Sequence, residues 1–394
     1  MKLPKLPALP PIVARLLSPI TSRIQAHKDK KAAQIAEAAK QAAIQADKQL
    51  IDELVAGLPN TESLMVRTCL ENQMAYINQD LASRPPSSLV GTKKIMMALA
   101  RRVMMHLLQF RGVVGIQPMQ APASLVYSMR FGDGGTVDGA QQMRLEVVSN
   151  AVAARTQKLQ ACYSIEVAHD MARMHDIDFE KEIVSILATE CAEDYARLII
   201  TDLIGAGEQL VATGETGPFM ATAVDNVIVT INKAANQIAQ HTRRGAGNVL
   251  IMSPIALAML SSSKTFQFAK DNNLDVSAYF LQKVGHVGNA GISKQYTVYT
   301  SLDPRLSQDG KETIIVGYKG GSGECDTAYI LCPYIPVTSS GVVIDPRTFA
   351  PQVQLMTRYG LFVADGSENT MYDVKNYYRT VTFDLTKFIE TLAV

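Results

Sequence analysis

The first hundred residues alternate between segments that break helices and segments with helical periodicity. Prolines recur through residues 1–21, which forbids a regular helix and favours an extended, basic arm. In residues 22–56, apolar positions recur every three or four residues, which predicts an amphipathic helix with a narrow apolar stripe, ended by Gly57 and Pro59. A lone helix cannot bury such a stripe, so it needs a partner on its own chain or on another copy.

Two further helices are predicted over residues 64–82 and 92–110. The second has an apolar face through Leu99 and Val103, with basic residues elsewhere. A basic amphipathic helix can lie on a membrane surface or bind calmodulin. We favour the simpler alternative, a packed helix with a solvated basic side, because most helices of this kind face a core.

Alternation of apolar and polar residues predicts a long hairpin. Its strands run through residues 125–131 and 159–167, and residues 132–156 connect them. A connection this long is unusual in a compact domain and normally indicates a function or a surface for a partner.

The clearest helical pattern covers residues 176–204. Asp176 or Asp178 can cap its start, and Gly205 and Gly207 follow its end. At ~1.5 Å per residue the helix would be roughly 40 Å long. That is about the length of a whole domain.

Residues 208–350 have the pattern of a separate α/β unit. A helix begins at the capping-box-like Thr222–Asp225, a short buried strand covers residues 249–252, and Ser253-Pro254 opens another helix. Further strands are predicted near residues 295–300, 312–318 and 327–332, and residues 352–364 and 376–386 look like a closing antiparallel pair.

Composition excludes several classes of protein. A chain of 394 residues predicts two or three packed units, and 47% hydrophobic with 19% charged residues indicates an ordered protein. A net charge of +1 gives no long-range attraction to nucleic acid and leaves little repulsion between copies. No apolar run is long enough to span a membrane, and prolines interrupt the run that a secretion signal needs.

The cysteines are odd in number, widely spaced and without any Cys-x-x-Cys pair, which predicts buried, reduced thiols in a cytoplasmic setting. The glycine-rich stretch Gly317–Gly323 lacks the spacing of a phosphate loop and leads from strand to strand, so we expect a tight loop. Ser322 is in no nucleophile elbow, because Glu324 stands where the last glycine would be needed.

Two clusters of polar residues have simple explanations. His169 and His175 flank acidic residues, but such residues before a helix usually cap it. Glu190, Glu193 and Asp194 share one side of the long helix, which predicts a charged face or a row of salt bridges between subunits. We therefore expect no enzyme, and no catalytic residue, cofactor or metal.

Several short blocks carry a resemblance to a known family. They are Val316-Gly317-Tyr318-Lys319-Gly320, Cys332-Pro333-Tyr334-Ile335-Pro336, Asp345-Pro346 and Thr357-Arg358-Tyr359-Gly360, with Gly115-Ile116-Gln117-Pro118-Met119 and Met129-Arg130 upstream. In this order and spacing they resemble the major capsid proteins of T-even-type myophages over roughly residues 112–386.

The resemblance implies an α+β tailed-phage major capsid fold, the fold named after phage Hong Kong ninety-seven. The implied parts are an N-terminal arm with helices (1–120), an extended loop hairpin that reaches onto a neighbour (121–170), the spine helix of the peripheral domain (171–207), the axial domain (208–350) and closing strands of the peripheral domain (351–394).

The implied function is that of a structural subunit, self-assembling into hexamers that tile an icosahedral head around DNA, with pentamers left open. Implied partners are scaffold, portal, vertex and decoration proteins, with non-specific DNA contact on the inner face. Lys28, Lys30 and Lys31 are candidates for that contact, or else a solvated helix face. The implied location is the virion, and the host cytoplasm before assembly. A pentamer-forming vertex paralogue and an encapsulin-like compartment shell are the alternatives.

Two features qualify the resemblance. T-even-type proteins carry an extra domain near the extended loop, and residues 132–156 are too few for one, so reinforcement would come from elsewhere, with the arm as a candidate. Members of the family often lose an N-terminal segment to a protease that cuts after Glu. Asn60-Thr61-Glu62 before Ser63 resembles such a site, and the sequence leaves its cleavage open.

Overall fold

A computed structural model describes most of the chain in two compact units, residues 1–56 and 57–394. The described residues are 34, 37–38, 40–83, 93–137, 140–175, 179–211, 220–263, 266–270, 281–289, 292–321, 323–348, 350–366 and 372–384. In the first unit, residues 40–55 are helical, which confirms that part of the helix predicted over residues 22–56. The predicted extended arm over residues 1–21 lies outside the described residues. Gly57 follows with a φ of +90°, the left-handed conformation that commonly ends helices.

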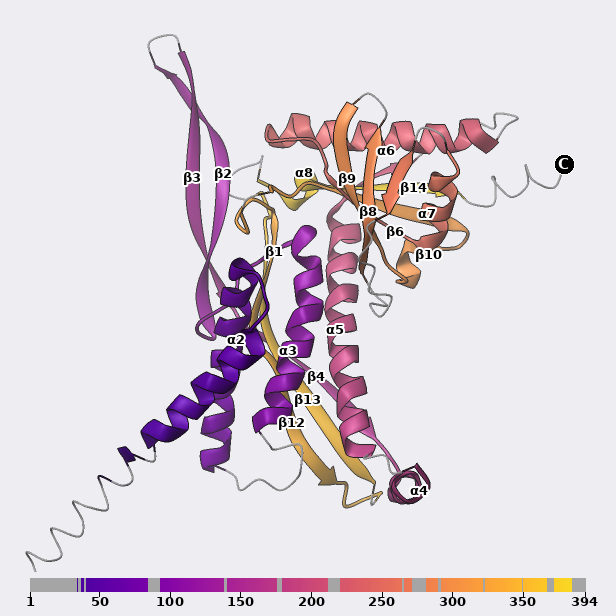
Figure 1. Ribbon diagram of the computed structural model, residues 1–394. Helices are drawn as coiled ribbons and strands as arrows, with labels where there is room; N and C mark the ends of the chain where they lie inside the picture. Colours follow the sequence, from indigo (N-terminus) through magenta and orange to yellow (C-terminus); the bar gives the residue numbers. More distant parts are fainter. Residues whose placement is uncertain are drawn as a thin grey trace, which may run out of the picture. The chain divides into compact units, whose positions relative to one another are not determined.

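A four-stranded sheet lies at one end of the second unit. Its order is β1 (Gly115–Ile116), β12 (Tyr329–Ile344), β13 (Pro351–Val363) and β4 (Arg155–Cys162). Three helices pack against it, α2 (Asn60–Ser83), α3 (Lys93–Gln109) and α5 (Phe179–Ala206) (Figure 1). Alternate residues of β13, from Val353 to Tyr359, are buried, which agrees with one covered face.

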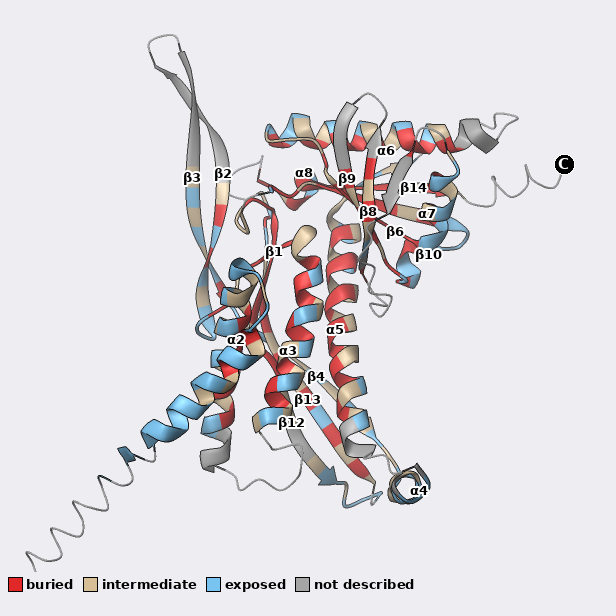
Figure 2. Cartoon of the chain, in the orientation of Figure 1, coloured by how far each residue is buried: buried red, intermediate tan, exposed pale blue. Residues whose placement is uncertain are grey.

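The helices α2, α3 and α5 confirm the sequence-based expectations. In α3, seven residues are buried, including Met97, Val103 and Leu107, so the helix is a packed helix. The expected solvated basic side is confirmed for Lys94 and Arg102, which are exposed, but not for Lys93 and Arg101, which are partly buried. Figure 2 shows buried positions along α3 and α5. In α5, Leu187, Tyr195 and Leu203 form part of the predicted buried face. Asp176 and Asp178, the predicted caps, lie outside the described residues.

A long two-stranded hairpin forms separately from both sheets. Strand β2 (Ala123–Val137) pairs with β3 (Ala140–Ala153), so the prediction of a loop over residues 132–156 is wrong. The predicted second strand, residues 159–167, is instead split. It belongs to β4 as far as Cys162, and α4 (Ile165–His175) follows. Alternation predicts which face a residue takes, but it does not select the partner strand.

The second sheet has eight strands. The path is β5 (Glu208–Val211), β14 (Tyr378–Asp384), β11 (Lys311–Gly317), β6 (Val249–Met252), β9 (Ile292–Thr300), β8 (Gln282–Asn289) and β7 (Gln267–Lys270), with β10 (Ser307–Gln308) paired to β11. Helix α6 (Met220–Thr242) packs its apolar face, including Val227 and Ile231, into the core of this sheet. The short helices α7 (Pro254–Ser261) and α8 (Val374–Tyr377) complete it.

The start of α7 was predicted correctly, and that of α6 was not. Ser253 accepts a hydrogen bond from the Ala256 N–H, with Pro254 in the first turn. Helix α6 is already helical at Met220, before the expected start at Thr222–Asp225.

The chain passes between the two sheets more often than predicted. Strand β12, expected in the unit 208–350, pairs with β13 in the four-stranded sheet. Strand β14, expected to pair with residues 352–364, pairs with β11 and β5 in the eight-stranded sheet. These partners are set by packing between residues far apart in sequence, which a local pattern does not contain.

Candidate functional site

The loop between β11 and β12 gathers several residues of the sequence blocks into a buried polar cluster. The Lys319 side chain is about 9% exposed, and its Nζ donates hydrogen bonds to the carbonyl oxygens of Arg111 and Val114 (2.9 Å for Val114). It also lies 3.1 Å from Oε2 of Glu324. Burial lowers the pKa of Lys319, and the Glu324 carboxylate opposes that shift. With these three partners, the Lys319 ammonium connects the loop to the backbone of Arg111 and Val114.

Glu324 joins this loop to the segment that precedes the hairpin. Its Oε1 accepts a 2.6 Å hydrogen bond from Nε of Arg111, and its Oε2 accepts one from the Ile116 N–H at 3.0 Å. Hydrogen bonding to Glu324 raises the pKa of Arg111. Nη1 of Arg111 also lies 3.4 Å from the Glu62 carboxylate. One charged network therefore connects α2, β1 and the loop.

The root of the hairpin is held by backbone groups on the edge of β2. Tyr127 donates its N–H to Oε1 of Gln117 (3.0 Å) and accepts from Nε2 of the same side chain (2.7 Å). The Met129 N–H donates to the carbonyl oxygen of Cys325 at 3.0 Å. Below these bonds, a small apolar cluster fixes the root, formed by Met119, Val126, Val152, Ile330 and Cys332.

A second ion pair lies beside the root of the hairpin. Nη2 of Arg244 lies 2.6 Å from Oδ2 of Asp326, and both side chains are about 12% exposed. The same nitrogen lies 3.7 Å from the sulfur of Met129. Burial raises the pKa of Asp326, and Arg244 opposes the shift. The Asn248 side chain bonds both the N–H and the carbonyl oxygen of Lys319, which ties the loop to β6.

The hairpin presents an apolar face to solvent. Leu125, Tyr127 and Val147 are 54%, 49% and 63% exposed. Leu125, Tyr127 and Met129 are alternate residues of β2, so their side chains lie on one face. Val147 is directly opposite Met129 on β3 and shares this face, so these side chains form one surface. A two-stranded ribbon has no core of its own. Such a contiguous exposed apolar surface is typical of a site for another protein.

The acidic residues of α5 form a cluster within the chain. Arg197 lies 3.1 Å from Glu190, 3.4 Å from Glu193 and 3.4 Å from Asp194. The sequence left open a charged face or salt bridges between subunits, and the described ion pairs are intramolecular. Burial, together with the nearby charge of Glu190, raises the pKa of Glu193 to about 7.

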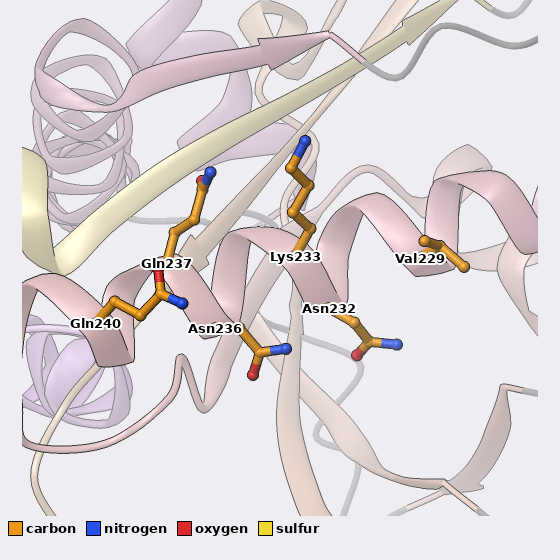
Figure 3. Close-up of a pocket in the computed structure, with 6 residues that line it drawn as sticks. All are labelled: Val229, Asn232, Lys233, Asn236, Gln237 and Gln240. Atoms are coloured by element: carbon orange, nitrogen blue, oxygen red, sulfur yellow. The ribbon is translucent and has the colours of Figure 1, made fainter.

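The described residues offer little for ligand chemistry. Among them, no three His, Cys, Asp or Glu side chains are grouped so as to hold a metal ion. A hollow of about 440 Å³ lies on α6, and all six side chains that line it, from Val229 to Gln240, come from this one helix (Figure 3). This hollow is an open groove along the surface of α6, and amide side chains and Lys233 line it. None of the helices in the described part of the chain could cross a membrane.

All five cysteines are free. Cys69, Cys191 and Cys332 are buried, as expected. Burial raises the pKa of Cys191 and of Cys332 to about 12, so both stay protonated at neutral pH. The expectation of a buried thiol is wrong for Cys162, which is exposed at the end of β4, and Cys325 is only partly buried.

Comparison with known protein families matches residues 132–383 to the family described as "Major capsid protein Gp23". The chain belongs to this family. The matched range contains the outer part of the hairpin, α5 and the eight-stranded sheet. The predicted resemblance and the predicted α+β tailed-phage capsid fold class are thereby confirmed, and the family is one of structural proteins, in agreement with the expectation of no catalytic activity.

Individual relatives are distant. The major capsid protein of Vibrio phage KVP40 is 28% identical over 255 residues, which are 59% of this chain and 47% of the phage protein. That of Enterobacteria phage T4 is 26% identical over 275 residues, 64% of this chain and 51% of the phage protein. The chain thus spans about half the length of the curated relatives it matches.

Two solved structures that the chain matches are "The capsid of Myoviridae Phage XM1" and "Mycobacterium phage Cain". The first has a TM-score of 0.40 and 11% identity, and the second a TM-score of 0.44 and 8% identity. Each similarity covers 70% of this chain and 90% of the other chain.

Sequence reasoning found part of this site. The blocks around Lys319 and Gln117 were singled out for their resemblance, without a role. Arg244 and Asp326 were missed, since an ion pair across 82 positions leaves no local signal. Candidate residues that lie outside the described residues are Lys28, Lys30, Lys31, Asp176, Asp178 and Ser322, together with the side chain of His175.

Proposed function

We propose that this protein is a structural subunit of a bacteriophage head and self-assembles into hexamers that tile an icosahedral shell around DNA. The observation that carries the proposal is the family match over residues 132–383. The exposed apolar face of the hairpin supports it, because a subunit that stays single has no use for such a face.

Each part of the fold has a proposed place in the shell. The hairpin β2–β3 is the extended loop, α5 is the spine helix, and residues 1–56 belong to the arm. The four-stranded sheet is the core of the peripheral domain, and the eight-stranded sheet that of the axial domain. Strand β12 pairs in the four-stranded sheet, and β14 pairs in the eight-stranded sheet. The proposed peripheral domain therefore includes β12, and the proposed axial domain includes β14.

The hairpin is the proposed principal contact within a capsomer. Its face around Leu125, Tyr127 and Val147 packs on the next subunit, and repetition of this heterologous contact closes a ring. A stable interface buries ~800 Å² per partner. A shell subunit with several neighbours exceeds that area several-fold, and the exposed Val167 and Met174 on α4 are the proposed contacts with other copies.

The proposed partners and locations follow from the same role. Scaffold, portal, vertex and decoration proteins are partners in assembly, the virion is the final location, and the host cytoplasm is the site of synthesis. The proposed contact of DNA with the inner face is non-specific, and the net charge of +1 gives it no long-range attraction.

Cleavage after Glu62 would require a local opening. Glu62 is in the first turn of α2, and its carboxylate is paired with Arg111. Ser63 donates its N–H to the Pro59 carbonyl oxygen at 2.8 Å. The peptide bond between Glu62 and Ser63 therefore lies within hydrogen-bonded backbone. Intact-mass measurement of the virion protein tests the proposal of a cut. A chain that begins at Ser63 supports it, and a chain that retains Asn60 to Glu62 excludes it.

Assembly of the purified chain is the direct test of the function. We would follow it by negative-stain electron microscopy and analytical ultracentrifugation over a series of concentrations and salts. Rings, tubes or shells with six-fold units are expected. Five-fold units alone would indicate a vertex paralogue, and closed shells that take up no portal on co-expression would indicate an encapsulin-like compartment. A monomer or dimer in every condition, including co-expression with scaffold and portal, would refute the proposal.

A pair of variants tests the hairpin contact. Leu125→Ser with Val147→Ser removes apolar area from an exposed surface, so we expect a folded subunit that no longer forms capsomers. Leu64→Ser is the matched control, because Leu64 is 67% exposed on α2. Equal assembly of the hairpin variant and the control would place the contact elsewhere.

A further inference from the structure

The outer edge of β2 is bonded at two points that do not belong to a strand. Tyr127 directs both its N–H and its carbonyl oxygen to the side chain of Gln117, and Met129 directs its N–H to Cys325. In an antiparallel pair, residues two apart point their backbone groups the same way. The backbone N–H and carbonyl groups of both residues therefore point away from β3. The Gln117 amide bonds to this edge, where a third strand would otherwise pair.

The acceptor at Cys325 is itself held in position. Its neighbour Glu324 is bonded by Arg111 and Lys319, and its other neighbour Asp326 is paired with Arg244 at 2.6 Å. The Asp326 carbonyl oxygen also accepts the Gly320 N–H at 3.0 Å. The edge of β2 is thus bonded to a loop fixed on both sides.

Arg244 extends this connection to the eight-stranded sheet. It lies two residues after the end of α6, and its Nη2 contacts both Asp326 and the sulfur of Met129. The pair is little exposed, so solvent weakens it less than it weakens a surface pair. A continuous path of contacts therefore runs from α6 through Arg244 and Asp326 to β2.

Met129 is the last of the two residues bonded in this way, and β2 continues to Val137. At ~3.3 Å per residue the strand extends roughly 26 Å further, so a rotation of about 10° at the root moves its end by about 5 Å. Small changes at the root are amplified at the outer part of the hairpin.

We propose that the Gln117 amide, the Cys325 carbonyl and the Arg244 guanidinium form a clasp that sets the direction of the hairpin and couples it to α6. The hairpin's role in the shell rests on the proposed function, but the clasp is a property of the single chain. Gln117 and Arg244 are positioning residues. A contact that moves the end of α6 thereby redirects the hairpin.

Hydrogen exchange of the full-length chain tests the bonds at Tyr127 and Met129. Gln117→Ala should speed exchange in the peptide covering residues 125–131 by about fivefold, the effect of one lost hydrogen bond. Gln160→Ala is the matched control, because Gln160 also hydrogen-bonds, to Gln352 at 2.8 Å, but lies on β4. Exchange that is equal in the two variants would overturn the role of Gln117.

Distance measurement by electron paramagnetic resonance tests the direction. Labels are placed at the exposed Cys162 and at Thr136→Cys near the end of β2, in a Cys325→Ser background that keeps the clasp carbonyl. Because Arg244→Met alone leaves a buried carboxylate and can fail to fold, Arg244→Met with Asp326→Asn is measured too. We expect a shifted or broadened distance in the clasp variants and the parent distance in Gln160→Ala. Parent distances in folded clasp variants would overturn the proposal.

These readouts separate the clasp from the proposed function. Altered exchange and distances in a chain that never assembles support the clasp and contradict the shell subunit. Parent-like exchange and distances in clasp variants of a chain that does assemble contradict the clasp and leave the shell subunit standing.

Discussion

The carboxylates around Arg197 lead to a prediction about stability and pH. Glu190, Glu193 and Asp194 share this one guanidinium, and Asp194 also accepts a hydrogen bond from Gln157 on β4 at 2.8 Å. Three acidic groups with one basic partner carry excess negative charge in a partly buried place. The substitution Glu193→Gln removes one charge from this cluster and keeps its shape.

The sign of the effect follows from the direction of the shift. Burial and Glu190 raise the pKa of Glu193 from an ordinary 4.5 to about 7, so between these values the folded chain holds a proton that the unfolded chain has lost. Stability therefore falls as the pH rises through this window, and the full loss is present above pH 7. Each pH unit corresponds to ~1.4 kcal/mol, but solvent screening reduces the total, so we expect about 1 kcal/mol.

Urea unfolding of the unassembled chain at pH 5 and pH 8 measures this effect. Glu193→Gln should raise the unfolding free energy by about 1 kcal/mol at pH 8 and by less at pH 5. Glu182→Gln is the matched control, because Glu182 is exposed on the same helix. A gain in Glu193→Gln that is equal at both pH values, or a gain of the same size in the control, would refute the reasoning.

Two further predictions concern packing. A methyl group at Gly320 would collide with the Asp326 carboxylate, whereas none of the described atoms lies within 4 Å of such a group at Gly321. We therefore expect Gly320→Ala to cost about 2 kcal/mol in thermal unfolding and Gly321→Ala to cost little. Val167 and Met174 on α4 are 48% and 76% exposed, so Val167→Ser with Met174→Ser should change the subunit's unfolding free energy by less than ~0.5 kcal/mol while weakening assembly in sedimentation. A melting temperature that falls as far as in Gly320→Ala would show that α4 is packed within its own chain.

The sequence predicted the parts of the fold that depend on local pattern. The helices α2, α3 and α5 have long periodic apolar faces, and the cap of α7 is the local pair Ser253-Pro254. Strands β13 and β14 were also placed within a few residues. Their partners were not, because alternation in β14 is equally compatible with either sheet.

The candidate site was predictable in the same limited way. Its block residues Gln117 and Lys319 were noted from the order of motifs, but what they do depends on where β2 passes. Asp326 and Arg244 meet only after β11, β12 and α6 are in place. A side chain that replaces a strand, as Gln117 does at Tyr127, has no periodic signal at all.

The exchange of strands between the two sheets has a consequence for synthesis. The four-stranded sheet needs β1 at residue 115 and β13 up to residue 363, and the eight-stranded sheet needs β5 at residue 208 and β14 up to residue 384. Neither sheet can close before its last strand has left the ribosome, which is β13 for the four-stranded sheet and β14 for the eight-stranded sheet. Contacts this far apart in sequence also fold slowly. Until β14 has been made, a growing chain therefore lacks the finished sheets that the proposed shell subunit needs.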